Sequence, residues 1–276
     1  MGLPIPPLEL LLAALLVALG SFLQGALGFG LAIFAAPPLF LIDPAFIPGP
    51  VLFVAMVISV IIVWRNRAGL ALGELGSAAI GRMPGMAAAF WLLAAAAQWL
   101  LSLVLGAAVL LGVVVSLLPG DIRPTRNRLL VAGFLSGFMG TATSVGGPPM
   151  ALLYQHARGP HIRANLGGYF LFGSTVSLAG MALLGHFGRA ELALALAVTP
   201  GALAGVLLSG RVHRWVDAGR IRPALLALCA LSAVAVIGKG LWGLLLGGLL
   251  GGSGEGGCTG RRWRARPSRL KALLSG

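Results

Sequence analysis

Two glycine-rich stretches carry residues of the types that bind a small anion. The first runs from Gln24 to Gly30 and the second from Thr143 to Gly147. A glycine run can interrupt a helix inside a membrane, and the helix that restarts directs free backbone N–H groups and its positive dipole end toward an anion. Hydroxyl and amide side chains nearby add neutral donors. The predicted substrate-binding residues are Gln24, Gly25, Gly28, Gly30, Thr143, Ser144, Gly146, Gly147 and Asn165.

Both stretches belong to a longer segment that occurs twice. The copies are Gly20 to Phe40 (GSFLQGALGFGLAIFAAPPLF) and Gly133 to Tyr154 (GFLSGFMGTATSVGGPPMALLY). Weak internal symmetry, with interrupted hydrophobic segments at corresponding places, is typical of membrane transporters built from two halves. A gap-free alignment pairs Leu19, Phe22, Ala26, Gly30, Ala35, Pro44 and Val60 with Leu135, Phe138, Ala142, Gly146, Ala151, Pro160 and Val176.

Other glycines have the spacing of helix crossings. Small residues four positions apart allow two helix backbones to approach closely in a membrane. The glycines of the repeated segment could serve the same purpose, but the prolines that follow them favour real helix breaks. We therefore expect tight packing, without a binding role, at Gly81/Gly85, Gly133/Gly137 and Gly201/Gly205.

The composition is that of a membrane protein. Of 276 residues, 58% are hydrophobic and only 10% are charged, and the mean hydropathy is +0.96. Apolar runs of about 20 residues, enough for a helix to cross a hydrocarbon core, recur with little polar sequence between them. The alternation expected of outer-membrane strands is missing. We predict an all-α fold: a polytopic integral membrane protein of about 8–10 hydrophobic helical segments, in two inverted repeats with glycine-broken or re-entrant helices.

Polar, glycine and proline residues divide the chain into ten approximate segments. Residues 1–120 form the first predicted transmembrane repeat, residues 121–250 the second, and residues 251–276 a flexible basic C-terminal tail. The first two segments of each repeat are short, so they are either half-helices or re-entrant hairpins. The segments are Leu8–Leu23, Gly30–Ile42, Ile47–Trp64, Ser77–Ala97, Leu100–Leu118, Arg128–Thr143, Gly147–His156, Asn165–His186, Glu191–Ser209 and Pro223–Leu250.

The arginines predict the orientation of these segments. Following the chain back and forth across the membrane leaves only Arg189 among the loops of one side. The positive-inside rule makes the opposite, arginine-rich side the cytoplasm. Five segments per repeat then make the second repeat inverted relative to the first. The cytoplasmic set is Arg65, Arg67, Arg82, Arg123, Arg126, Arg128, Arg158, Arg163, Arg211, Arg214, Arg220 and Arg222.

The basic tail fits this scheme poorly. It would be extracellular if the last segment crossed the membrane once, whereas a hairpin at Gly238-Lys239-Gly240 would return it to the cytoplasm.

The net charge of +13 could suggest nucleic acid. Because the charge lies in short loops and one tail, orientation and anionic membrane lipid explain it better, and we expect no nucleic-acid partner.

The sequence contains no recognisable catalytic or metal-binding set. It lacks a phosphate-binding glycine loop, paired metal-binding histidines and a nucleophile elbow, so we expect no enzyme, no metal and no cofactor. Its acidic residues all fall near segment ends or in loops, which argues against a buried carboxylate proton relay and favours an anion over a metal cation. They are Glu9, Asp43, Glu74, Asp121, Glu191, Asp217 and Glu255.

The two copies resemble the sulfite exporter TauE/SafE family, whose members carry two related halves that each open with a glycine-rich interrupted helix. The resemblance covers roughly Leu8 to Leu246 and rests on GSFLQGALGFGLAIFAAPPL, GFLSGFMGTATSVGGPPMALLY and the following RANLGGYFLFGSTVS. Phe29 and the Ser144-Val145 pair depart from a fuller glycine cluster. The resemblance implies a multi-pass permease of the bacterial cytoplasmic (inner) membrane for a small sulfur-containing anion, such as sulfite or an organosulfonate.

These observations predict a secondary transporter, which we expect to be an exporter. It would hold a small anion between the two glycine breaks and move it by alternating access. A membrane scaffold or assembly subunit, whose small-residue surfaces bind other helices, is the alternative. An intramembrane enzyme would need a reactive cluster that the sequence lacks. The expected partners are the anionic substrate and membrane lipid. The sequence leaves open whether the protein forms a homo-oligomer.

Overall fold

Apolar residues without strand-like alternation form helices throughout the part of the chain that the structure describes. A computed structural model describes residues 5–95, 98–117, 124–154, 160–210 and 222–250. Within these ranges there is no β-strand, which confirms the all-α class. The elements are α1 (Pro7–Leu27), α2 (Leu31–Ile42), η1 (Pro44–Phe46), α3 (Gly49–Asn66), η2 (Arg67–Gly69), α4 (Leu72–Ala95), α5 (Gln98–Leu117), α6 (Arg126–Thr143), α7 (Gly147–Leu153), α8 (Pro160–Leu183), α9 (Arg189–Ser209) and α11 (Arg222–Leu250).

Several helices have the length and composition of membrane spans. Leu31–Ile42, Trp99–Val114 and Cys229–Leu245 are apolar over shorter stretches. Large apolar side chains such as Leu11, Trp91 and Leu183 face outward, as expected of a surface in contact with lipid. The protein is therefore a multi-pass membrane protein. The four described helices that are long and apolar enough to cross are Pro7–Leu27, Gly49–Gly69, His161–Leu183 and Arg189–Ser209.

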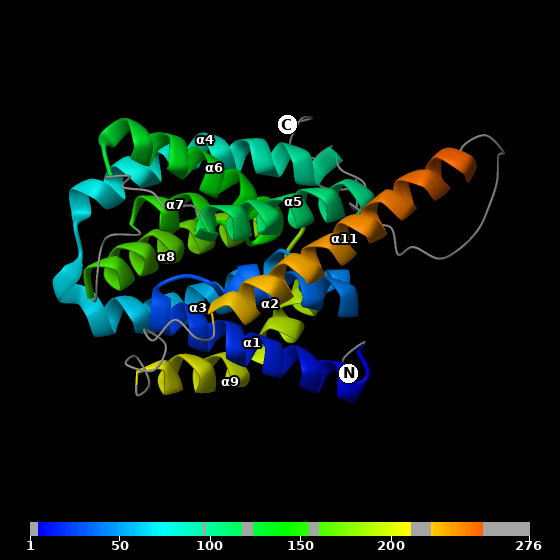
Figure 1. Cartoon of the computed structure of the whole chain (residues 1–276), viewed down its shortest axis with the longest axis horizontal. Coiled ribbons are helices and arrows are strands. Elements are labelled where there is room, and N and C mark those ends of the chain that lie inside the picture. The colour runs from blue at the N-terminus through cyan, green and yellow to red at the C-terminus, as the bar shows by residue number, and fades with distance from the viewer. Residues whose placement is uncertain (1–4, 96–97, 118–123, 155–159, 211–221, 251–276) are drawn as a thin grey trace, which may run out of the picture.

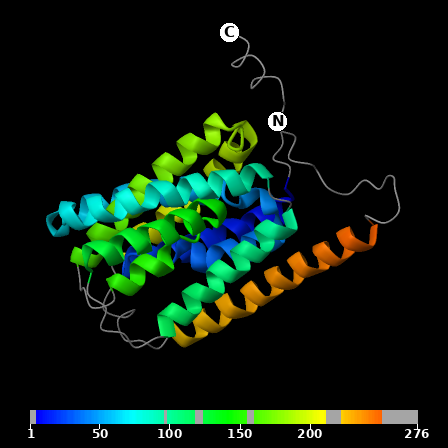
Figure 2. The ribbon, with the colours of Figure 1, turned by 90° about the horizontal axis from the view of Figure 1, so that it is seen from above.

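Helices that are far apart in the sequence pack in pairs. Helix α1 packs on α9, α4 on α6, α3 on α8 and α5 on α11. In Figure 1, α1 and α9 lie along one side of the bundle and α4 and α6 along the opposite side. Helix α11 forms an edge beside α5 (Figure 2). Because α1 and α4 both pack on helices of the other predicted repeat, the described helices of the two repeats interlock.

The packing pattern is unchanged when the helices of the two repeats are exchanged. Helices α1 to α5 correspond in order to α6, α7, α8, α9 and α11. The pair α1–α9 then becomes α6–α4, α3–α9 becomes α8–α4, and α2–α11 becomes α7–α5, and all six pairs are observed. Two related halves would pack in this way. The inverted orientation of the repeats stays a prediction.

Glycines make two close helix crossings possible. A Cβ built on Gly81 or Gly85 of α4 would overlap a backbone carbonyl of α6, and a Cβ on Gly133 of α6 would overlap one of α4. At the other crossing, a Cβ on Gly201 of α9 would lie 2.6 Å from the carbonyl oxygen of Ala14 in α1. Real Cβ atoms do not approach so closely, so these positions require glycine. The predicted packing role of these glycines, together with Gly137 and Gly205, is confirmed.

The chain folds back at both interruptions. Gly20 of α1 lies against Leu31 of α2: a Cβ on Gly20 would be 3.0 Å from the Leu31 carbonyl oxygen. A continuous helix would separate these two residues by about 16 Å. In the second repeat, the Ser136 hydroxyl donates to the carbonyl oxygen of Gly146, ten residues later. The chain therefore turns back on itself between the two helices of each copy, and the choice between full crossings and re-entrant hairpins stays a prediction.

The predicted segments match the described helices to within a few residues, with two corrections. Helix α11 runs without a break through Gly238-Lys239-Gly240, so the suggested hairpin there is wrong. Arg82, expected at the cytoplasmic face, lies near the middle of α4 and is only 2% exposed. The tail 251–276 and five loop arginines lie outside the described residues: Arg123, Arg158, Arg211, Arg214 and Arg220.

Candidate functional site: two helix interruptions

The two interruptions share one local geometry. Gly28 ends α1 in the left-handed conformation, with φ of 91°, and its N–H donates to the Gln24 carbonyl at 2.7 Å. Ser144 ends α6 in the same way, with φ of 66°, and its N–H donates to the Gly140 carbonyl at 2.9 Å. The repeat alignment pairs Gly28 with Ser144. A left-handed helix end is usually glycine, so Ser144 adopts this conformation at some cost in strain.

The interruptions lie against each other. A Cβ on Gly147, the first residue of α7, would be 3.7 Å from the Cβ of Phe29, which lies between α1 and α2. Both hairpins also contact α5, where a Cβ on Gly112 would lie 2.8 Å from Pro148 and 3.6 Å from Ile33. The tertiary structure therefore brings together two stretches that are more than one hundred residues apart in the sequence.

An unpaired amide side chain and a hydrogen-bonded arginine both lie at the first interruption. Gln24 is 4% exposed, and its Nε2 has no hydrogen-bond partner among the described residues. Gly30 lies directly before α2 and has φ of 127°, a conformation that favours glycine. Arg163 of α8 lies beside Gly28, and its guanidinium donates to the Ala26 carbonyl at 3.5 Å and to Asn66 at 3.2 Å. Gln24 is thus the better placed donor for a ligand.

Gly25 has a different environment from the other predicted glycines. A Cβ there would overlap the Ser209 hydroxyl of α9, so this glycine permits close packing. It also lines a cavity of about 630 Å³ between the ends of α1, α3 and α9, together with Ile62, Arg65 and Asn66. The Arg65 guanidinium donates to the Val206 carbonyl at 3.0 Å in this cavity.

In the second interruption the polar groups are bonded within the protein. The Thr143 hydroxyl donates to the Met139 carbonyl at 2.7 Å and accepts from the Val145 N–H at 3.3 Å. The Ser144 hydroxyl donates to the Pro48 carbonyl at 2.9 Å, and the Gly146 N–H donates to the Ser144 carbonyl at 3.1 Å. These contacts stabilise the hairpin. A ligand would have to replace one of them to use the same donors.

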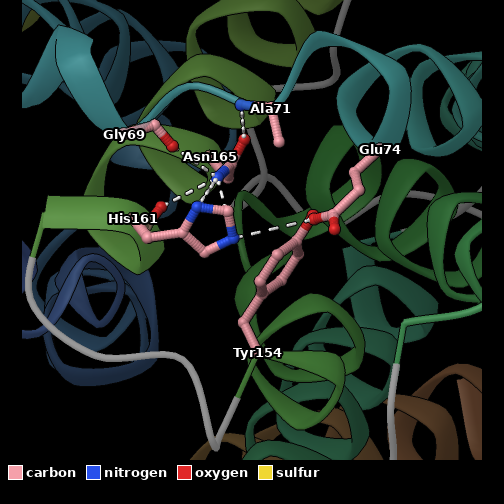
Figure 3. A network of polar contacts seen from close by, with 6 residues as sticks. All are labelled: Gly69, Ala71, Glu74, Tyr154, His161 and Asn165. Atoms are coloured by element: carbon pink, nitrogen blue, oxygen red, sulfur yellow. Dashed lines mark hydrogen bonds and ion pairs between the residues drawn. The ribbon is translucent and has the colours of Figure 1, made fainter.

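Asn165 belongs to a polar network at the start of α8. Its Oδ1 accepts from the Ala71 N–H at 2.8 Å, and its Nδ2 donates to the carbonyls of Gly69 at 3.0 Å and His161 at 2.9 Å (Figure 3). Both amide protons are therefore engaged. The side chain joins α8 to the segment between α3 and α4, and its hydrogen bonds among the described residues do not reach either interruption.

Glu74 extends the same network to the end of α7. The Tyr154 hydroxyl donates to Glu74 Oε2 at 2.8 Å, and His161 Nε2 lies 4.0 Å from the same oxygen (Figure 3). Burial and this hydrogen bond to Glu74 raise the pKa of Tyr154, so the phenol keeps its proton and remains a donor. The network thereby ties the end of the second hairpin to the first turn of α4.

Of the residues with buried, unpaired polar atoms, only Gln24 was among the predicted site residues. Besides Gln24, the described part contains buried, unpartnered atoms at the hydroxyls of Ser21 and Ser59 and at Nε and Nη1 of Arg82. Serine hydroxyls in apolar segments are common, so they give little signal. Arg82 does give one, because a lone arginine inside the apolar segment Ser77–Ala97 is unusual in a membrane helix.

Carboxylates are confined to helix ends in the described part of the chain. Glu9, Glu74 and Glu191 lie in the first turns of α1, α4 and α9, and Asp43 caps α2. Asp121, Asp217 and Glu255 lie outside the described residues. No group of three possible metal ligands occurs among the residues described. Near the interruptions the described part therefore offers amide, hydroxyl and guanidinium donors, and its acidic residues lie at helix ends.

Comparison with known proteins gives one family. No curated protein and no solved structure matches the chain. The family model for the sulfite exporter TauE/SafE matches residues 12–236, which contain both interruptions and every described helix except the start of α1 and the second half of α11. This range agrees with the resemblance seen in the repeated segments. The chain belongs to the sulfite exporter TauE/SafE family.

Proposed function

We propose that the protein is a secondary transporter that exports a small anion, such as sulfite or an organosulfonate, across the bacterial cytoplasmic membrane. The observation that carries the proposal is the contact between the interruptions, at Phe29 and Gly147. Transporters with repeated halves bind their substrates where broken helices of the two halves meet. The family match supports the anionic, sulfur-containing substrate.

The binding region would lie between the two hairpins. Gln24 would supply an amide donor, and the backbone at Gly28, Gly30, Gly146 and Gly147 would allow close approach of an anion. Thr143 and Ser144 would contribute once their present hydrogen bonds are exchanged for bonds to the ligand. Gly25 and Asn165 would act indirectly, by packing on α9 and by holding the start of α8.

Movement of one hairpin relative to the other would provide alternating access. Phe29 and Ile33 of one hairpin lie against Gly147 of the other. Among the described residues no ion pair joins the hairpins, so they can separate without breaking one. Nothing in this cycle requires a covalent step, and we propose no enzymatic activity. Membrane lipid would surround the exposed apolar faces of the helices and solvate them.

The test is flux in proteoliposomes. Purified protein is reconstituted, and the movement of sulfite, thiosulfate, taurine, sulfoacetate, sulfate and chloride is followed against protein-free vesicles. The proposal expects selective flux of at least one sulfur-containing anion, and stabilisation of the detergent-solubilised protein by the same anion. A ligand at one hundred times its Kd adds about 2.7 kcal/mol. Folded protein that neither moves nor binds any of these anions would favour the scaffold alternative.

A further inference from the structure

Arg82 is a buried cation without a counter-ion in the described part of the chain. It is 2% exposed, near the middle of α4, and its Nε and Nη1 have no hydrogen-bond partner there. An arginine keeps its positive charge in proteins, so it cannot lower the cost of burial by losing a proton. A charge held inside a membrane protein is expensive and usually marks a functional site.

Three helices build the place that Arg82 occupies. A Cβ on Gly173 of α8 would overlap the guanidinium, and a Cβ on Gly137 of α6 would lie 2.9 Å from Arg82 Cγ. The guanidinium lies over the ring of Tyr169 in α8, 4.8 Å from its centroid. The Tyr169 hydroxyl donates to the Gly133 carbonyl at 3.2 Å, which holds the ring in place. The arginine is thus positioned by α6 and α8.

The guanidinium lies next to the second interruption. A Cβ on Gly140 would be 3.2 Å from Arg82 Nη2 and also 3.2 Å from the Cα of Gly146. Arg82 Nη2 and the Gly146 Cα are therefore separated by no more than twice that distance. One helical turn beyond Gly137 and Gly173, the hydroxyls of Thr141 and Ser177 share a buried hydrogen bond of 2.8 Å. Positive charge and hydroxyl donors thus come together beside the hairpin.

We propose that Arg82 binds the transported oxyanion through its guanidinium, beside the second interruption. This rests on the proposed function, and it narrows the substrate class to anions with two or more oxygens, such as sulfite or a sulfonate, in preference to halides. A guanidinium presents several N–H donors in a fixed plane, which matches an oxyanion better than a spherical ion. The cation–π contact with Tyr169 stabilises the charge while no anion is bound.

Access to Arg82 requires movement of the helices that enclose it. In the described conformation α4, α6 and α8 leave the side chain almost no exposure. Separation of the α6–α7 hairpin from α4 would open the guanidinium to an anion, and the same movement belongs to an alternating-access cycle. The bound anion would then neutralise the buried charge at the stage when the site closes.

The experiment compares Arg82→Gln and Arg82→Lys with a matched control. Arg67→Gln removes a different arginine that also lies over an aromatic ring, 5.3 Å from the centroid of Trp64, but is exposed. Binding of sulfite, sulfate and chloride is measured from anion-dependent thermal shifts in detergent, and sulfite flux from proteoliposomes. Folding is checked by gel filtration and by the melting temperature without anion.

The expected result is specific to Arg82. Arg82→Gln should weaken sulfite binding and flux by tenfold or more without lowering the anion-free melting temperature, because the variant removes an unpaired buried charge. Arg67→Gln should bind as the wild type does. If Arg82→Gln fails to fold, Arg82→Lys still decides: a lysine lacks the forked donors, so sulfite affinity should fall and the preference over chloride should narrow.

Two outcomes overturn the assignment, and they differ in what else they overturn. In the first, folded Arg82→Gln binds and transports sulfite as the wild type does, or Arg82→Lys does so if the glutamine variant does not fold. Arg82 would then be a packing residue, and the proposed transport function would stand. No binding or flux of any oxyanion by folded wild-type protein would overturn both proposals together.

Discussion

The backbone of Gly147 lies against the side chain of Phe29, so close that a Cβ on Gly147 would be 3.7 Å from that of Phe29. Each residue belongs to one copy of the repeated segment. The contact places the turns of the two hairpins side by side, at the point where a substrate of a two-repeat transporter would bind. It also leaves no room there for a large side chain.

A bulky residue at this contact should block transport. Gly147→Leu would push its side chain against Phe29 and Ile33, and we expect sulfite flux in proteoliposomes to fall at least tenfold. Gly76→Leu is the matched control, because Gly76 is exposed and a Cβ there meets nothing within 4 Å. Normal flux in folded Gly147→Leu would place the substrate route elsewhere.

Alanine at the glycine crossings should destabilise the protein. In Gly85→Ala and Gly205→Ala the new Cβ would overlap the carbonyl oxygens of Phe134 and Ala18, so each helix pair must move apart. We expect a loss of about 1–3 kcal/mol in the free energy of unfolding for each variant. Unfolding by denaturant in detergent measures it.

A third glycine provides the control for these crossings. Gly238 of α11 is exposed and has no neighbour within 4 Å of a built Cβ. Gly238→Ala should be stabilising by about 0.5–1 kcal/mol, because alanine loses less backbone entropy than glycine when a helix forms. Equal effects at all three positions would contradict the crossing geometry.

The hydrogen bond between Tyr154 and Glu74 should couple the second hairpin to α4. Tyr154→Phe removes the hydroxyl and should cost about 1 kcal/mol, which is less than for a fully buried bond to a carboxylate because the Glu74 side chain is 32% exposed. In a double-mutant cycle with Glu74→Gln, the two losses should be less than additive. Tyr169→Phe is the control, since its hydroxyl bonds to Gly133 instead, and its loss should add to that of Glu74→Gln.

Thiol labelling tests the predicted orientation. Helices α3 and α8 are antiparallel: Asn66 meets Arg163 at one end, and Gly49 meets Met181 and Phe187 at the other. In a background without Cys229 and Cys258, Ala68→Cys and Ala190→Cys place a thiol at an exposed position near each end. A membrane-impermeant reagent added to whole cells should label position 190 and spare position 68. The reverse pattern would place the arginine-rich loops outside.

The existence of the helices and of the two interruptions between them was predictable. Long apolar runs without alternation specify helices in a membrane, and the repeated glycine and proline positions located both turns to within a few residues. The glycine spacing at Gly81/Gly85 and Gly201/Gly205 likewise predicted close crossings, because only glycine allows such backbone contact. Asn165 shows the limit of this reasoning, since residue type alone did not indicate that its amide is bonded to Gly69, Ala71 and His161.

What the sequence determined by itself was local: membrane composition, helical segments, and the places where the chain turns back. Each follows from residues that are neighbours in the chain. The tertiary structure decided which helices pair, that Phe29 and Gly147 meet, and that Arg82 lies in the interior beside Gly140 with two of its nitrogens unpaired. These depend on packing between distant segments. The position of Arg82 within an apolar segment was visible in the sequence, but only the helices packed around the side chain determine whether water can reach it.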